Sequence, residues 1–169
     1  MSDYTSEFIW LSGPPPGGLK IRHVGVINLG NFYRWLNRFM SFYGLFKKNT
    51  DFEEWYMEET QGPGKKIEIK WHGKHDANKY FTYHIHIMWL LIAVTDIEAE
   101  KNGIKIKLQK GDYELRLAAG VEKKIPKSIF KRIYHFFIIN KTIEDHKDKV
   151  YDFLYTLHGE ITKQLKQPI

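Results

Sequence analysis

The stretch KYFTYHIHIMWLLIAV, residues 79–94, decides the fold class of this 169-residue chain. Its first half alternates between apolar and polar residues, which is the period of a β-strand with one face in a core. Tyr83 and Ile85 mark the inward face, and His84 and His86 mark the outward face. Beyond His86 both faces are apolar, so we expect other residues to cover that end of the strand.

Similar alternating segments lie on both sides of this strand, separated by short turn signals. Asn102-Gly103 is a strong hairpin signal, and Gly62-Pro63 separates another pair of segments. The pattern predicts an antiparallel meander preceded by one strand near the N-terminus. The expected strands are residues 21–29, 52–60, 65–72, 79–94, 96–101, 103–109 and 112–121.

Helices are expected before and after the meander. Phe32, Leu36, Phe39 and Tyr43 follow one another at helical spacings and form one apolar stripe. A longer amphipathic helix begins near Thr142, and its apolar face should pack on the sheet. The sequence therefore predicts an α+β fold in which six or seven antiparallel strands wrap on a long C-terminal helix.

The first twenty residues differ from the rest of the chain in composition. The run SGPPPGG at residues 12–18 can enter neither a helix nor the middle of a sheet. Residues 1–20 are therefore predicted to be a flexible Pro/Gly-rich tail. Residues 21–169 have a length typical of one α+β domain.

Composition excludes several classes of function. The chain has no cysteine, which excludes disulfides, thiolate nucleophiles and cysteine-ligated metals. We see neither a signal peptide nor an apolar run long enough to span a bilayer, so a cytoplasmic protein is expected. Lys and Arg outnumber Asp and Glu by 26 to 20, which modestly favours anionic partners.

No catalytic or metal site is predicted. The acidic pairs at residues 53–54 and 58–59 are neighbours on strands and point to opposite faces, so neither pair forms a dyad. His84 and His86 share a face and could offer two ligands to zinc, but a site needs a third. Nothing in the sequence fixes His72 beside them. The favoured interpretation is two histidines on a solvated sheet face, and no cofactor is expected. A non-enzymatic protein is favoured over an enzyme such as a hydrolase or cyclase, for which no nucleophile or base stands out.

The basic residues suggest an alternative function. Many of them fall on the outward face of the expected strands, and two more lie on the first helix. Such a surface could bind RNA or the ribosome, although a charged face that only confers solubility is favoured. The residues of this alternative site are Arg34, Arg38, Lys70, His84, His86, Lys105, Lys107 and Arg116.

The segment KRIYHFF at residues 131–137 mixes cations with bulky apolar groups. It could lie on a membrane surface. Ile129, Ile133, Phe136 and Phe137 can instead all reach the core at helical spacing, and the core interpretation is favoured.

The order of elements from Ile21 to Leu165 resembles the helix-grip arrangement of START-like domains. In that family a curved antiparallel sheet wraps around the last helix, and an apolar ligand is commonly held between them. The segments KKIEIKW at residues 65–71 and TIED at residues 142–145 are also similar to small uncharacterised archaeal proteins, for which no activity can be named.

The START-like resemblance implies a non-enzymatic protein that holds an apolar small molecule or lipid between the sheet and the C-terminal helix. The inward residues would line such a pocket. They are Trp55, Ile69, Trp71, Phe81, Tyr83, Ile85, Leu115 and Leu117 from the sheet, with Phe153 and Leu157 from the helix.

Overall fold

A computed structural model describes residues 4–46, 52–101 and 103–166. The strands are β1 (Tyr4–Trp10), β2 (Leu19–Ile27), β3 (Glu53–Gln61), β4 (Gly64–Asp76), β5 (Phe81–Lys101) and β6 (Ile104–Pro126). The helices are α1 (Leu29–Phe42), α2 (Ile129–Tyr134), the π-helical segment η1 (His135–Ile139) and α3 (Asn140–Leu165).

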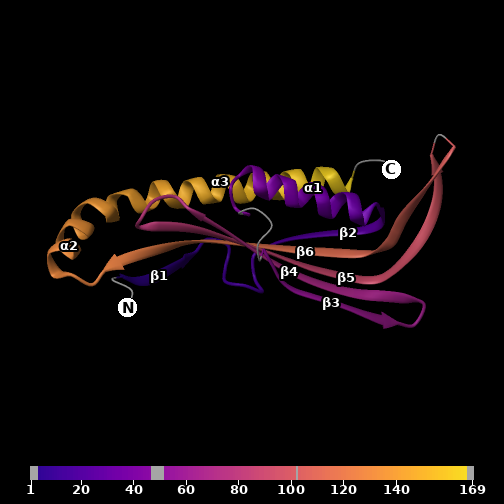
Figure 1. The fold of residues 1–169 in the computed structure, drawn as a ribbon, viewed down its shortest axis with the longest axis horizontal. Coiled ribbons are helices and arrows are strands. Elements are labelled where there is room, and N and C mark those ends of the chain that lie inside the picture. Colours follow the sequence, from indigo (N-terminus) through magenta and orange to yellow (C-terminus); the bar gives the residue numbers. More distant parts are fainter. Residues whose placement is uncertain (1–3, 47–51, 102, 167–169) are drawn as a thin grey trace.

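One curled antiparallel sheet contains all six strands. Its order is β1-β6-β5-β4-β3, and β2 pairs with β6 on the same side as β1. The long helices α1 and α3 lie side by side over one face of the sheet (Figure 1). The predicted α+β fold, with a curled sheet and a long C-terminal helix, is confirmed.

The N-terminal segment differs from the predicted tail. Residues 4–10 form β1, in which Tyr4 pairs with Pro126 and Trp10 with Gly120. After a loop over residues 11–18, β2 continues along the same edge of β6. The edge of a strand as long as β6 carries more backbone groups than β2 alone can pair, and β1 satisfies the remainder.

Strands β5 and β6 are each longer than predicted. A bulge between Ile92 and Thr95, with Ala93 at a φ of 53°, bends β5 without ending it. Gly111, which falls between two of the predicted strands, lies beside the bulge, where a Cβ would come within 3.2 Å of the Ile92 carbonyl oxygen. The hairpin predicted near Gly103 joins the two strands, and Asn102 lies outside the described residues.

The core lies between the helices and the inward face of the sheet. Asn28 caps α1, because its side chain accepts a hydrogen bond from the Asn31 N–H. The rings of Phe39 in α1 and Phe153 in α3 lie 6.3 Å apart, which brings the two helices into contact. Within the described residues, no helix combines the length and apolarity needed to cross a bilayer.

The segment α2–η1 was expected to contribute to the core, and that prediction is wrong. Ile129, Ile133, Phe136 and Phe137 are exposed by 72%, 55%, 63% and 63%. The reason is geometric: α2 extends past the end of the sheet, where no strand lies beneath it (Figure 1). Among the bulky residues of this segment, Ile139 is buried where η1 leads into α3.

Candidate functional site

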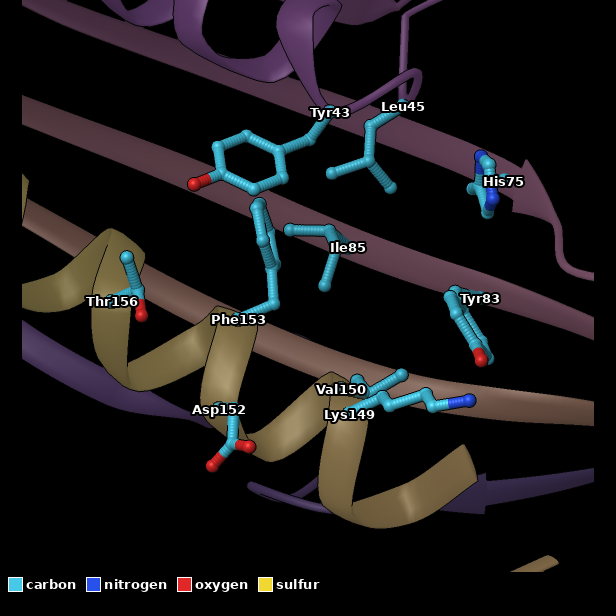
Figure 2. Close-up of a pocket in the computed structure, with 10 residues that line it drawn as sticks. All are labelled: Tyr43, Leu45, His75, Tyr83, Ile85, Lys149, Val150, Asp152, Phe153 and Thr156. Carbon is cyan, nitrogen blue, oxygen red and sulfur yellow. The ribbon is translucent and has the colours of Figure 1, made fainter. Parts of the chain in front are cut away.

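A groove of about 360 Å³ opens between α3, the end of α1 and the sheet. Figure 2 shows the side chains around it, with Phe153 of α3 pointing toward Tyr43 and Ile85, and Asp152 pointing away from them. Most of the lining is apolar, and a few polar groups lie at the rim. The lining residues are Tyr43, Leu45, His75, Tyr83, Ile85, Lys149, Val150, Asp152, Phe153 and Thr156.

Aromatic pairs mark the two ends of the groove (Figure 2). At one end Tyr43 and Phe153 meet edge to face, with ring centroids 4.9 Å apart. At the other end His75 and Tyr83 lie opposite each other on β4 and β5, with centroids 5.9 Å apart. Ile85 is buried between the two ends. This lining suits an elongated apolar ligand.

The hydroxyl group of Tyr83 is not free to contact a ligand, because it lies 2.6 Å from Nδ1 of His146 in α3. Burial raises the pKa of Tyr83 and lowers the pKa of His146. The positive charge of Lys149 lowers the pKa of His146 further. The tyrosine hydroxyl and the neutral imidazole therefore share a hydrogen bond at neutral pH, and the tautomer of His146 sets which of them donates. This bond ties α3 to β5 beside the groove and presents the tyrosine ring, rather than its hydroxyl, to the interior.

Apart from Trp55, the predicted pocket residues separate into two groups. Tyr83, Ile85 and Phe153 line the groove. The others on the inward face are almost fully buried and fill the core rather than a cavity. The members of this second group are Ile69, Trp71, Phe81, Leu115, Leu117 and Leu157.

Trp55 was predicted to point inward and lies on the opposite face, with 49% of its surface exposed. Pairing is regular from Gln61 opposite Gly64 to Trp55 opposite Lys70, and the bulge lies beyond this run, between Glu53 and Trp55. Glu53 is opposite the inward Trp71, but Trp55 is opposite the outward Lys70. A one-residue shift moves a side chain to the other face of a sheet.

Sequence reasoning missed several groove residues. His75 continues the inward alternation of Ile69 and Trp71, but the predicted strand ended at residue 72. Tyr43 belonged to the predicted stripe of the first helix, and only the fold brings it against α3. Leu45 follows α1 and packs on Gly73, where a Cβ would come within 3.1 Å of the Leu45 Cβ.

Several residues of the predicted basic surface are paired with acidic groups. Arg116 contacts Glu114 at 2.7 Å, and Lys107 contacts Asp96 at 3.0 Å. RNA binding through this surface stays a prediction, and the geometry gives it less support than it gives the groove. Lys105 lies 3.9 Å from Glu98, and Lys70 lies over the ring of Trp55. Arg34 and Arg38 are exposed on α1. His84 and His86 lie on the outward face of β5.

Comparisons of the chain with protein-family models, with curated proteins and with solved structures found no match.

Proposed function

We propose that the protein is a non-enzymatic binding protein that holds a small apolar or amphipathic molecule, such as a single lipid chain, in the groove between α3 and the sheet. The observation that carries this proposal is the groove, with its apolar walls and its opening to solvent. Its volume of about 360 Å³ lies near the lower end of typical small-molecule sites, so it favours a small ligand.

The polar rim indicates how an amphipathic ligand would be oriented. Lys149, Asp152 and Thr156 are exposed on α3 at the edge of the groove. An apolar body between Phe153 and Ile85 would leave the polar end of the ligand at this rim. Lys149 is the rim group that suits a carboxylate or phosphate at that end.

The likeness to START-like domains supports the same location. We propose that the chain uses the helix-grip arrangement in the manner of that family, with the ligand between the curled sheet and the C-terminal helix. The protein differs from that family in its sheet interior, which is filled by residues such as Trp71 and Leu117, and the groove lies beside α1 and α3.

Filling the groove should weaken ligand binding. Thr156→Trp places a large ring at the mouth, and we expect it to weaken binding of anilinonaphthalene sulfonate, an apolar anionic dye, by about tenfold or more. Dye fluorescence measured in a titration checks this. Tyr155→Trp, on the neighbouring exposed position of α3, is the control and should bind as the native chain does. Equal affinity of both variants would contradict the proposal.

A further inference from the structure

Three histidines meet on the face of the sheet that is turned away from the helices. His72 on β4 is directly opposite His86 on β5, and His84 is two residues before His86 on the same strand. One ring nitrogen of each histidine lies within 4.8 Å of the others. The rings of His72 and His86 stack at 3.9 Å, and Nε2 of His72 lies 2.9 Å from Nδ1 of His84.

Carboxylates hold the outer nitrogens of two of these rings. Nδ1 of His72 lies 2.8 Å from Glu54, and Nε2 of His84 lies 2.9 Å from Glu122. An ionised carboxylate only accepts hydrogen bonds, so both of these nitrogens carry a hydrogen. Carboxylates placed in this way orient metal-binding imidazoles and raise their basicity.

This arrangement leaves two lone pairs facing each other. If both rings are neutral, Nε2 of His72 and Nδ1 of His84 are both acceptors at 2.9 Å, and no hydrogen bond can form between them. An additional proton or a metal ion would resolve the conflict.

The cluster is shielded by aromatic rings on one side and borders a groove on the other. Phe8 of β1 packs against His84, and Trp10 packs against His86, which shields one side of the cluster. On the other side a second groove of about 410 Å³ borders His72 and His84. Its charged lining has three carboxylates and two ammonium groups, namely Glu54, Asp76 and Glu122 with Lys74 and Lys124.

We propose that His72, His84 and His86 bind a divalent transition metal ion, with Zn²⁺ as the best-fitting candidate. Three neutral imidazoles with an open fourth position toward a groove form a donor set that zinc commonly accepts. The site lies on the face opposite the ligand groove, because His84 and His86 alternate with Tyr83 and Ile85 along β5. The two proposals can therefore fail separately.

Calorimetric titration with Zn²⁺ alone tests the site, using the full chain without a polyhistidine tag after treatment with a chelator. We expect one ion per chain and a higher melting temperature with zinc. His84→Ala removes a ligand and should weaken binding by more than about 100-fold, whereas Glu54→Gln should weaken it by roughly 10-fold. His158→Ala, on α3, is the control and should leave zinc binding unchanged.

Two results would overturn this assignment. One is a native chain that binds no stoichiometric zinc, and the other is a His84→Ala chain that binds zinc as tightly as the native chain. If His84→Ala does not fold, the Glu54→Gln variant tests the site instead. An affinity for zinc equal to that of the native chain in this variant would contradict the site. Glu54 is an exposed residue, so its replacement by an isosteric amide should preserve the fold.

A second, independent observation concerns the exposed segment α2–η1. Ile129, Phe130, Ile133, Phe136 and Phe137 are all more than half exposed, so they form an unusually apolar surface. No Asp or Glu occurs from residue 123 to residue 143. The exposed cations of this stretch are Lys127, Lys131, Arg132 and Lys141.

We infer that α2–η1 lies on the surface of an anionic lipid bilayer. Bulky apolar side chains enter the headgroup boundary, and nearby Lys and Arg are attracted to acidic lipids. An anionic surface would repel acidic side chains, and this stretch of sequence contains none. The inference depends on this segment and not on the groove or the histidines.

Vesicle co-sedimentation tests the inference, with phosphatidylcholine vesicles compared with vesicles that also contain phosphatidylglycerol. We expect binding to the anionic vesicles, a loss of about tenfold or more in Phe130→Ala, and no loss in Phe42→Ala. Phe42 and Phe130 are both 85% exposed, so the pair is matched. The inference is overturned if both variants lose binding equally or if the protein shows no preference for anionic lipid. It is also overturned if the protein binds no vesicles and instead self-associates through Phe130.

Discussion

Trp71→Ala is expected to lower the free energy of unfolding by about 3–5 kcal/mol. Trp71 is 1% exposed, and its ring lies within 5.1 Å of the rings of Tyr33, Phe52 and Trp89. Its Nε1–H also donates to the Glu53 carboxylate at 3.1 Å. The substitution therefore opens a cavity where α1, β3 and β5 meet, and it removes one donor from a carboxylate. Urea unfolding followed by circular dichroism measures the effect.

Two other variants separate the causes of this loss. Trp71→Phe keeps a ring in the core but removes the donor to Glu53, and it should cost less than Trp71→Ala, about 1–2 kcal/mol. Trp55→Ala removes the same type of side chain from the exposed face of the neighbouring strand, where it contacts Lys70. Its cost should stay under about 1 kcal/mol. Similar losses at Trp55 and Trp71 would contradict the register of the β3–β4 hairpin.

This pair also shows what local sequence could predict. Alternation placed Ile69, Trp71 and Ile85 on the inward face, because each lies in a strand without interruption before it. The same rule failed for Trp55, because the register counted from the turn of the hairpin sets Trp55 opposite the outward Lys70. A bulge between Glu53 and Trp55 then changes the face of the residues before it. Bulges depend on the partner strand, and a single segment does not reveal its partner.

The candidate sites were also beyond local sequence patterns, because they depend on contacts between segments that are far apart in the sequence. His84 and His86 were correctly placed on one face, but the sequence described that face as solvated, and His84 is 4% exposed. Two unpredictable features explain the difference: the register of β4 on β5 brings His72 beside them, and β1 places Phe8 over His84. Similarly, the groove depends on Tyr43 reaching α3, and helical periodicity does not specify which helix is the neighbour.

The loop between β1 and β2 passes close to β6, and Gly18→Ala should disrupt it. Gly18 has a φ of 112°, and a Cβ there would lie 2.1 Å from the Leu117 carbonyl oxygen. The backbone strain from the positive φ and the steric clash can be relieved only if the loop moves away from β6. We expect a loss of roughly 2–4 kcal/mol in the free energy of unfolding, measured in urea.

The position of this loop gives the substitution a second, local consequence. The Leu11 N–H donates to the Ala119 carbonyl oxygen at 2.9 Å, and Tyr151 of α3 donates to the Leu11 carbonyl oxygen at 2.8 Å. Displacing the loop in Gly18→Ala should weaken both bonds and increase proteolysis within residues 11–18. Gly62→Ala is the matched control, because its φ is also positive but no atom lies within 4 Å of the added Cβ. It should cost only about 1 kcal/mol, through backbone strain alone, so equal losses in the two variants would contradict the close approach of the loop to β6.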